Sequence, residues 1–311
     1  MPERGVAYLT TADALDEAAG RLVHLGGEPR REARALWSAL AGDDPGTVWL
    51  RLERPAPADL LERFQHAVAQ RAAGAPFEYV VGRTSFRTLD LKVDDRALIP
   101  RPETEGLVEL VLQHVRATCN VQRGTSNGQR ATCNVQRGTS RTVADIGTGC
   151  GCIALSLAVE GDFERVIAVE RSPGAAALAR ENVALVRPPV PVEVREGDLL
   201  APLAGGRYCA IVANPPYLTE AEFAELDPAV RLFEPRDALV SGPDGLVATQ
   251  ALLAGGRGLL EPGGLLALEV DERRAERVAG LARELGWSRV NVHDDLFGRP
   301  RYVLAILEED A

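Results

Sequence analysis

The sequence predicts an α/β protein, in which a small all-helical domain and a linking β-hairpin precede a mostly parallel sheet with an antiparallel last strand. Three observations lead to this prediction. Residues 1–80 place apolar side chains at helical spacing. Residues 85–94 alternate apolar and polar side chains, as a hairpin does. From residue 142 onward, strand-like apolar runs alternate with helix-like segments, the order that builds parallel βαβ units.

The N-terminal part is expected to form a helical domain over residues 1–82. Three segments carry the helical pattern and end at or just before glycine, as helix C-termini often do: 12–27, 31–42 and 58–74. His24 and His66 fall inside these patterns, where a packed or exposed histidine is expected rather than a metal ligand. Residues 83–100 then form the hairpin linker, with its alternating apolar side chains at Phe86, Leu89, Leu91 and Val93.

A second domain is expected over residues 101–311. Pro102 is placed to open its first helix, with Glu103 and Glu105 in the first turn, where the helix dipole favours acids. The undecapeptide "RATCNVQRGTS" then occurs twice, at 116–126 and 130–140. A copy this short and polar builds no core, so residues 116–140 are expected to be a duplicated insertion in a surface loop.

A glycine-rich loop follows the first strand of this domain. Apolar runs at 143–146 and 166–169 flank a helix-like segment at 152–159, and the loop between strand and helix carries Gly147, Gly149 and Gly151. This spacing alone is a weak signal, because a tight turn in any doubly wound domain would give it. Glu170 ends the second strand, where acids bind ribose hydroxyls in nucleotide folds. Asp145, beside the glycines, suits a cationic ligand better than a pyrophosphate.

Two further strands also end in polar residues. A short strand within 191–200 leads to Asp198, and residues 208–213 lead to Asn214. Because ligands bind beyond the carboxyl ends of parallel strands, these side chains should converge with the glycine loop and Glu170. The remaining elements are expected to be helices around 244–260 and 272–285, a strand at 264–270, and a closing antiparallel hairpin at the sheet edge, 289–294 with 301–307.

The stretch Asn214-Pro215-Pro216-Tyr217 predicts a stiff elbow at a strand end, because proline fixes φ and cannot donate to a sheet. The Asn214 side-chain oxygen and the Pro215 carbonyl can each accept one N–H of a planar nitrogen. Pro216 keeps the elbow rigid, and Tyr217 can pack against the planar group. Since Asn-Pro is also a common turn opener, the motif gains its meaning from the glycine loop upstream.

Composition limits the class of protein. The chain is 46% hydrophobic and 26% charged, and its net charge of −10 opposes a large nucleic-acid footprint. No apolar run reaches the roughly 20 residues that span a bilayer, and the N-terminus lacks a signal-peptide pattern, so a cytoplasmic protein is expected. Five cysteines without paired CxxC spacing support neither a disulfide framework nor a zinc site, and Cys150 and Cys152 are interpreted as loop packing.

The motifs "DIGTGCG", "AVE" and "NPPY" resemble those of the class I, Rossmann-like, S-adenosylmethionine-dependent methyltransferases. Residues 71–109, "NPPYLTEAE" and residues 231–246 are similar to the PrmC/HemK family of protein-(glutamine-N5) methyltransferases, with the resemblance running from about residue 15 to 307. It implies that the helical domain recognises the substrate, and that residues 101–311 methylate the glutamine of the Gly-Gly-Gln loop in class 1 peptide chain release factors. No membrane, metal or direct nucleic-acid substrate is expected.

The same resemblance implies roles for individual residues. The loop would hold the methionine end of S-adenosylmethionine, Glu170 its ribose, and Asp198 with Leu199 its adenine. The expected cofactor site comprises Asp145, Gly147, Thr148, Gly149, Cys150, Gly151, Glu170, Asp198, Leu199 and Asn214. The expected substrate site comprises Asn214, Pro215, Pro216, Tyr217, Arg101 and Phe86, of which the first four are also the expected catalytic residues.

Three other functions fit parts of the pattern. An N6-adenine methyltransferase of DNA or RNA would use the same elbow, but it needs a basic recognition region, and residues 1–80 hold more acids than bases. A glutamine methyltransferase of ribosomal protein L3 shares the motif region, and "RPETE" favours release factors over it. A non-enzymatic binding module would not need both the cofactor loop and the acceptor elbow.

Overall fold

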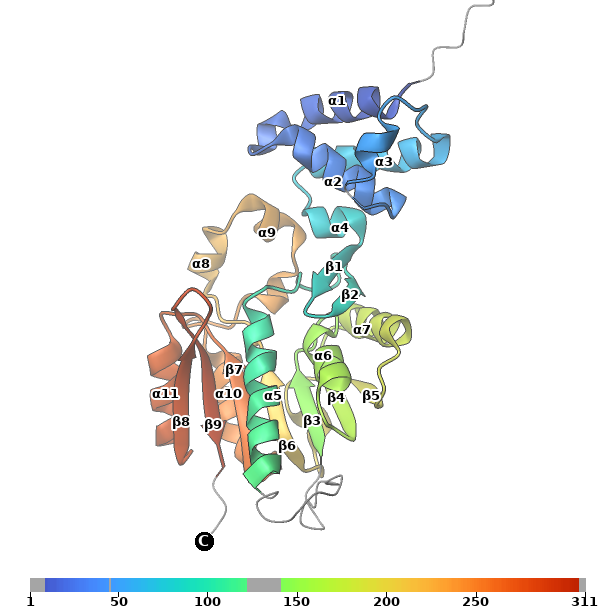
Figure 1. The fold of residues 1–311 in the computed structure, drawn as a ribbon. Coiled ribbons are helices and arrows are strands. Elements are labelled where there is room, and N and C mark those ends of the chain that lie inside the picture. The colour runs from blue at the N-terminus through green and yellow to red at the C-terminus, as the bar shows by residue number, and fades with distance from the viewer. Residues whose placement is uncertain (1–8, 45, 122–140, 308–311) are drawn as a thin grey trace, which may run out of the picture. The chain divides into compact units, whose positions relative to one another are not determined.

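The computed structural model describes residues 9–44, 46–121 and 141–307, and it divides into two compact units (Figure 1). The first unit comprises Met1–Arg83 together with Asp227–Phe233. The second comprises Thr84–Leu226 and Glu234–Ala311. The sequence contains no signal that residues 227–233 would pack with the helical unit rather than with the sheet.

The first unit is all-helical, as predicted. Its elements are α1 (Thr11–Leu22), η1 (Val23–Leu25), α2 (Pro29–Ala41), η2 (Val48–Arg51), α3 (Ala58–Ala72), the short α4 (Phe77–Val81) and α9 (Pro228–Phe233). Thr10 and Asp13 form a capping box that begins α1. The core centres on Trp37 and Phe64, whose rings meet edge to face at 5.0 Å between centroids. His24 and His66 are exposed, and His24 Nε2 lies 2.8 Å from the Ala72 carbonyl oxygen.

The predicted hairpin is confirmed as β1 (Arg83–Phe86) and β2 (Leu89–Lys92). At its turn, Arg87 pairs with Glu160 at 2.7 Å and Glu109 at 2.9 Å, which anchors the hairpin to two helices of the second unit. Asn182 accepts the Lys92 N–H at 2.8 Å and donates to the Lys92 carbonyl at 3.0 Å. Since Asn182 also donates to the Cys150 carbonyl at 2.8 Å, one side chain ties the hairpin to the glycine loop.

The second unit is built on a seven-stranded sheet in the order β5-β4-β3-β6-β7-β9-β8. Its strands are β3 (Thr142–Ile146), β4 (Arg165–Glu170), β5 (Val192–Glu196), β6 (Tyr208–Ala213), β7 (Leu260–Glu269), β8 (Arg289–Asp294) and β9 (Pro300–Ile306). The first five in the order are parallel, and β9 runs antiparallel to both of its neighbours. The antiparallel last strand and the closing hairpin are therefore confirmed. Within this hairpin, β9 inserts between β7 and β8, which leaves β8 as the edge strand.

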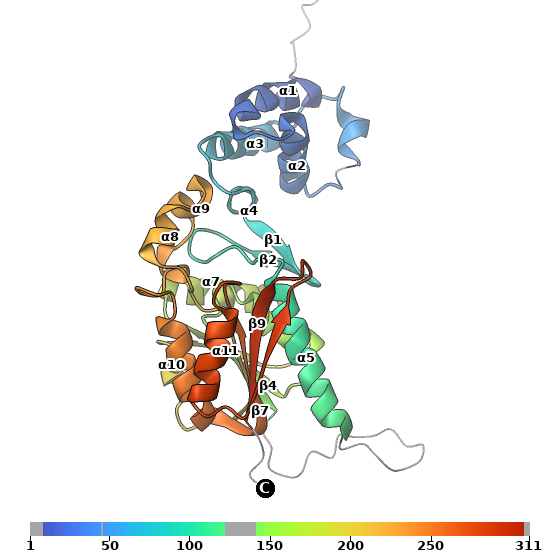
Figure 2. The ribbon, with the colours of Figure 1, turned by 90° about the vertical axis from the view of Figure 1, so that its left-hand side faces the viewer.

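Helices cover the two faces of this sheet (Figure 2). On one face α10 (Val247–Gly256) and α11 (Ala275–Glu284) pack together, and their apolar residues share a core with alternate residues of β3, β4, β6, β7 and β9. On the other face α5 (Thr104–Val121) packs beside α6 (Cys152–Glu160). Both α6 and α7 (Pro173–Val186) contact β2. Short helical elements lie in the connections between these strands and helices: η3 (Ala201–Leu203), α8 (Glu220–Ala224), η4 (Arg236–Ala238) and η5 (Arg257–Leu259).

Some expected boundaries differ. Helix α5 begins at Thr104, with Pro102 in the turn before it, and β5 ends at Glu196, which leaves Asp198 in the following turn. Residues 116–121, expected as loop, continue α5, and the remainder of the duplicated insertion lies outside the described residues. Within the described parts of the chain, no helix combines the length and apolarity needed to cross a membrane.

Candidate active site

The sheet register brings most of the predicted site residues to one edge. Ile146 pairs with Val169 on one side and with Ala213 on the other, so the glycine loop leaves β3 between the ends of β4 and β6. Glu170 ends β4, and Asn214 directly follows β6. These residues, distant in sequence, therefore lie at adjacent carboxyl ends of parallel strands, where α/β sheets bind ligands.

The glycine loop adopts a conformation that only glycine takes without strain. Gly147, Gly149 and Gly151 have φ values of +71°, +58° and +91°. The N–H groups of Gly147 and Thr148 both donate to the Val169 carbonyl, at 2.9 and 3.0 Å, which fixes the start of the loop. A Cβ at Gly147 would meet no atom within 4 Å, so space there is open to a ligand. At Gly151 a Cβ would lie in ordinary contact with Leu155, at 3.4 Å, so the positive φ rather than crowding favours glycine there.

Asp145 hydrogen-bonds to the glycine loop and to the helix that follows it. Its side chain is fully buried, and Oδ2 accepts the Thr148 hydroxyl at 2.6 Å and the Ala154 N–H at 3.1 Å. Burial raises the pKa of Asp145 to about 7, although both hydrogen bonds oppose the shift. Among the described residues, Oδ1 has no hydrogen-bond partner. The carboxylate therefore holds Thr148 and the start of α6 in place, and its expected contact with the cofactor stays a prediction.

Glu170 joins the loop to the next helix. Its Oε2 accepts the Gly149 N–H at 2.9 Å, and its Oε1 accepts the Ser172 N–H at 2.8 Å. Ser172 caps α7, so one carboxylate sets the spacing between the glycine loop and the start of α7. Each oxygen keeps a further lone pair, and the residue is only partly buried. Glu170 can therefore accept additional hydrogen bonds from a ligand beside the loop.

Residues 198 and 199 follow β5 at the same edge. Asp198 is exposed, and its backbone carbonyl accepts the Ala201 N–H at 3.1 Å. Leu199 has a φ of +46°, an unfavourable conformation for a leucine, and its side chain packs against the sheet core. Cys150 and Cys152 are buried free thiols, so Cys150 can reach a ligand only through its backbone.

The Asn-Pro-Pro-Tyr elbow presents two hydrogen-bond acceptors. Asn214 Nδ2 donates to Thr104 Oγ1 at 3.1 Å, which restrains the amide and leaves Oδ1 as its acceptor. Within the described chain, no donor bonds to Asn214 Oδ1 or to the Pro215 carbonyl. The Tyr217 N–H and the Leu218 N–H donate to the Leu239 carbonyl at 3.2 and 2.8 Å, which holds the end of the elbow.

Glu269 is a site residue that the sequence reasoning missed. It ends β7 beside Asn214, is 1% exposed, and its Oε2 has no hydrogen-bond partner among the described residues. Burial raises its pKa to about 7, against the opposing effects of the Thr104 hydroxyl and the Arg301 guanidinium. Burial also raises the pKa of Tyr217 to about 12, with the Glu269 charge adding to the shift. A lone carboxylate in the apolar run 264–270 was the signal available in the sequence.

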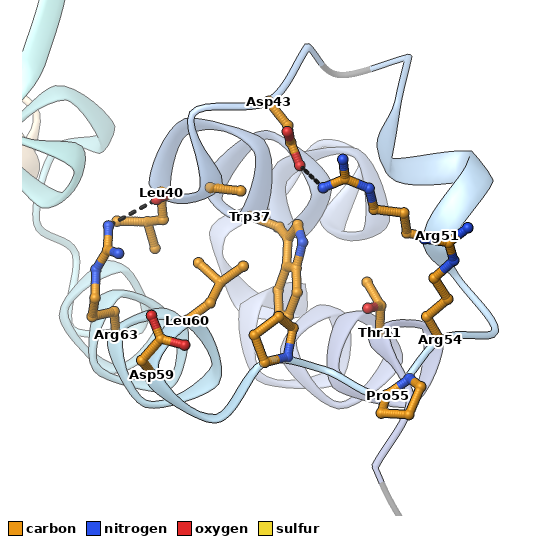
Figure 3. A pocket seen from close by; sticks show the side chains of 12 residues that line it. Thr11, Trp37, Leu40, Asp43, Arg51, Arg54, Pro55, Asp59, Leu60 and Arg63 are labelled. Carbon is orange, nitrogen blue, oxygen red and sulfur yellow. Dashed lines mark hydrogen bonds and ion pairs between the residues drawn. The ribbon is translucent and has the colours of Figure 1, made fainter.

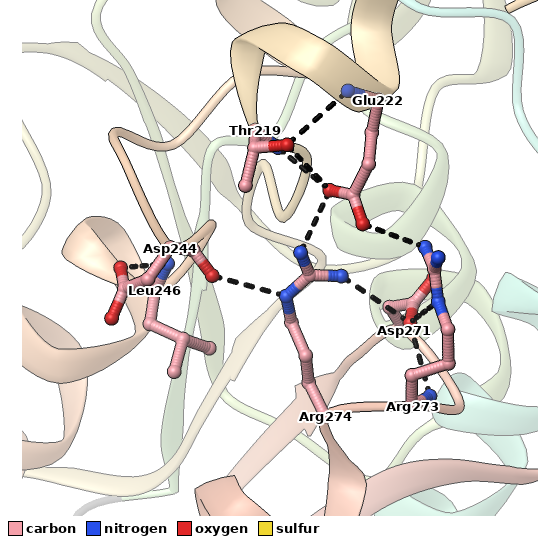
Figure 4. A network of polar contacts seen from close by, with 7 residues as sticks. All are labelled: Thr219, Glu222, Asp244, Leu246, Asp271, Arg273 and Arg274. Atoms are coloured by element: carbon pink, nitrogen blue, oxygen red, sulfur yellow. Dashed lines mark hydrogen bonds and ion pairs between the residues drawn. The ribbon is translucent and has the colours of Figure 1, made fainter. Parts of the chain in front are cut away.

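An ion-pair network links α8, which follows the elbow, to the residues after β7 (Figure 4). Glu222, which forms a capping box with Thr219 at the start of α8, pairs with Arg274 at 2.7 Å and with Arg273 at 2.9 Å. Asp271 pairs with the same two arginines, at 2.9 Å to Arg273 and 3.3 Å to Arg274. The Arg274 Nε also donates to the Asp244 carbonyl at 3.1 Å. The network thus links α8, the residues after β7 and the residues before α10 to one another.

The two remaining predicted substrate residues differ in their surroundings. Arg101 is partly exposed, and it pairs at 2.6 Å with Glu234, whose side chain is almost fully buried. Its charge opposes the raised pKa of Tyr217 in the elbow. Phe86 is 1% exposed and packs the hairpin interior, so as the structure stands its ring cannot contact a substrate.

A separate cavity of about 420 Å³ lies in the helical unit (Figure 3). Trp37 and Leu60 line it, and Figure 3 shows the Asp43–Arg51 ion pair, at 2.7 Å, across its upper part. The lining mixes basic and acidic side chains and includes none of the predicted site residues. It carries no signature of a particular ligand.

Comparison with known proteins gives consistent matches. Residues 13–82 match the PrmC N-terminal domain, and residues 130–242 match the methyltransferase small domain. The release factor glutamine methyltransferase of Moorella thermoacetica is 40% identical over 304 residues, which cover 97% of this chain and 100% of that protein. The release factor glutamine methyltransferase of Cereibacter sphaeroides is 39% identical over 300 residues, 96% of this chain and 99% of that protein.

Solved structures support the fold. The hMettl16 catalytic domain in complex with MAT2A 3'UTR hairpin 6 aligns with a TM-score of 0.53 at 17% identity, covering 81% of this chain and 83% of that chain. The same domain in complex with hairpin 1 aligns with a TM-score of 0.53 at 16% identity, covering 88% of this chain and 91% of that chain. At these identities the likeness concerns the fold alone.

Proposed function

Because this chain belongs to the release factor glutamine methyltransferase family, we propose that it methylates a peptide chain release factor on the side-chain nitrogen (N5) of a glutamine. The target would be the glutamine of the Gly-Gly-Gln loop in class 1 release factors, and the methyl donor S-adenosylmethionine. One observation carries the proposal: two free acceptors on the rigid elbow, Asn214 Oδ1 and the Pro215 carbonyl, lie at the sheet edge that holds the glycine loop.

The residues at the loop fit S-adenosylmethionine. The open space beside Gly147 accepts a ligand close to the backbone, and Glu170 has lone pairs available for two ribose hydroxyls. Asp198 and Leu199, at the next strand end, would contact the adenine. When bound, this cofactor supplies an electrophilic methyl group on a sulfonium sulfur. The protein's task is then to bring a nitrogen to it in the correct orientation.

The elbow fits a primary amide. An amide nitrogen is a poor nucleophile because its lone pair is delocalised, so it must be held in line with the methyl group. Its two hydrogens match the two free acceptors, Asn214 Oδ1 and the Pro215 carbonyl, which also stabilise positive charge developing on the nitrogen. Thr104 preorganises Asn214, since the hydrogen bond that Nδ2 donates to the Thr104 hydroxyl oxygen restrains the position of Oδ1.

No general base is required at the elbow. The nitrogen becomes acidic once methylated, and it can release its proton afterwards. Tyr217, with its pKa raised to about 12, stays protonated at neutral pH and is suited to packing against the planar amide rather than to accepting a proton. The helical domain, residues 1–82, would recognise the release factor away from the modified loop.

Labelling with a methyl-tritiated donor tests this function. We expect label on intact release factor, and none on ribosomal protein L3 or on duplex DNA. A release factor with the loop glutamine changed to glutamate should stay unlabelled, because the attacking nitrogen is replaced by oxygen. Label on that variant would mean that another position of the release factor is methylated. Label on DNA in preference to release factor would favour adenine as the target. Either result would overturn the proposal.

A further inference from the structure

The turn between β8 and β9 exposes two large apolar side chains. Leu296 is 99% exposed and Phe297 is 73% exposed, although both lie in a short turn between two strands of the sheet. We call residues 295–299 the hairpin tip. An isolated exposed leucine needs no explanation, but two adjacent large apolar residues at such exposure on one short turn form a contact surface.

The hairpin tip is held rigidly. The Asp295 carboxylate accepts the N–H groups of Phe297 at 2.9 Å and Arg299 at 3.1 Å. The Asp295 backbone closes the turn with two further hydrogen bonds, to the Arg299 carbonyl at 2.8 Å and from the Gly298 N–H at 3.0 Å. Gly298 supplies the left-handed φ of +74° that the turn requires. The apolar side chains are therefore displayed by a fixed turn, which costs little entropy to bind.

The hairpin tip lies at the carboxyl edge of the sheet, next to the elbow. β9 is antiparallel to β7, with Tyr302 opposite Glu269, so the residues preceding β9 extend beyond the end of β7 where Glu269 lies. Arg301 connects the two places: its Nε is 3.4 Å from Asp295 Oδ2, and its charge lowers the pKa values of both Tyr217 and Glu269. Figure 1 shows the β8–β9 turn at the end of the sheet where α8 follows the elbow.

We propose that Leu296 and Phe297 dock the protein substrate, by contacting an apolar surface of the release factor next to the loop that enters the site. This inference rests on the proposed function. A second copy of the chain is a poorer occupant, because one leucine and one phenylalanine from each copy bury less than the about 1,000 Å² that a stable dimer needs. A substrate already held by its loop at the elbow needs only a small additional contact.

The test uses the full-length double variant L296S/F297S with intact, unmethylated release factor. We expect KM for release factor to rise at least tenfold, with kcat at saturation within about twofold of wild type, because the contact is remote from the reacting atoms. The matched control is Leu185→Ser. Leu185 is 49% exposed near the C-terminus of α7. This helix packs against β4 and β5, at the other end of the strand order from β8 and β9, so the substitution should leave KM unchanged.

Calorimetric affinity for S-adenosylmethionine verifies that each variant is folded. An unchanged KM in the folded double variant, with wild-type enzyme active on release factor, overturns the docking role and leaves the proposed function standing. If wild-type enzyme does not label release factor at all, the proposed function fails and this inference fails with it. Loss of a wild-type dimer in the double variant, with KM unchanged, assigns the hairpin tip to a second copy and likewise overturns the proposal.

Discussion

At the scale of single residues, the Thr104 hydroxyl determines how the Asn214 amide is presented. Thr104 is 2% exposed and accepts the Nδ2 hydrogen bond, so its removal takes away a contact that orients the half-buried amide. We expect Thr104→Val to lower kcat about tenfold, and Asn214→Ala, which removes the acceptor itself, to lower kcat about 100-fold. Single-turnover methylation of release factor measures both.

The matched control for Thr104→Val is Thr249→Val in α10. Thr249 is 1% exposed, and its hydroxyl has no hydrogen-bond partner in the described structure, so the same chemical change removes no bond. Its turnover should equal that of wild type. Equal turnover of Thr104→Val and Thr249→Val would show that Thr104 does not orient Asn214.

Glu170 is expected to carry much of the cofactor affinity. Charge-assisted hydrogen bonds contribute about 1.5–3 kcal/mol, so Glu170→Ala should weaken S-adenosylmethionine binding at least tenfold. Loss of the bonds to Gly149 and Ser172 should add to the effect by loosening the loop. Calorimetric titration compares this variant with Glu164→Ala, an exposed acid just before the start of the same strand. Equal affinity in the two variants would remove Glu170 from the cofactor site.

The buried Glu269 should make stability depend on pH. Its folded pKa of about 7 lies above the ordinary 4.5, so between these values the folded state binds the extra proton. Its contribution to the free energy of unfolding is therefore most favourable below about pH 4.5. This contribution declines as the pH rises towards 7 and is constant above that value. A shift of this size corresponds to roughly 3 kcal/mol.

Glu269→Gln tests the sign, because it keeps the shape and removes the titration. We expect urea unfolding from about pH 5 to about pH 8 to show the wild-type free energy of unfolding falling relative to that of the variant. Asp145, whose pKa is also raised to about 7, is present in both proteins and cancels in the difference. Parallel pH profiles would mean that Glu269 does not titrate in this range.

At the scale of elements, the elbow depends on the loop that packs against it. Gly245 has a φ of +75°, and a Cβ there would lie 2.3 Å from the Tyr217 carbonyl oxygen. Gly205 has a similar φ of +78°, but a Cβ there would meet no atom within 4 Å. Both Gly→Ala changes incur the left-handed penalty of about 1–2 kcal/mol, and only Gly245→Ala must also displace the elbow.

We therefore expect Gly245→Ala to cost at least 2 kcal/mol more than Gly205→Ala in chemical denaturation, and to lower turnover while Gly205→Ala does not. The difference between the two variants isolates the steric contact, since their backbone strain is matched. Similar losses in both would indicate that the loop yields without moving Tyr217.

Elements with a local sequence signal were predictable, and those fixed by long-range packing were not. The strand at 208–213 was predicted at its observed bounds, because the two prolines after Asn214 must end it. The position of β9 inside the sheet was not, since strand order is set by packing rather than by local pattern. Phe86 and Asp145 were expected to take part in the site, and both are buried, because neither spacing nor alternation reports how deeply a side chain lies.

The candidate site shows the same division. Motif residues that supply backbone geometry or follow a strand, such as Gly147 and Asn214, were predicted as site residues from spacing, and they lie at the same edge of the sheet. Thr104, Glu269 and Arg301 come from three separate elements and meet only when the sheet is assembled. Their roles depend on burial, which neither composition nor periodicity reports.

At the scale of the whole molecule, the chain has far more surface than the chemistry of one amide requires. The proposed cofactor and catalytic residues lie at the ends of a few strands, and the helical unit contains none of them. If remote contacts with the substrate contribute to transition-state binding, a fragment that carries only the reacting loop loses them. Glycines beside the target glutamine still allow close approach to the elbow, so the fragment can react slowly.

We expect a short Gly-Gly-Gln peptide to be methylated with a kcat/KM at least 100-fold below that of intact release factor, a difference of about 2.7 kcal/mol or more. Steady-state kinetics with both substrates measures it, and the peptide with glutamate in place of glutamine is the control for label at the intended nitrogen. The double variant L296S/F297S should narrow the gap, because it loses contacts that only intact release factor makes. Equal kcat/KM for peptide and protein would mean that recognition resides wholly in the loop, and that neither the helical unit nor the hairpin tip contributes to substrate choice.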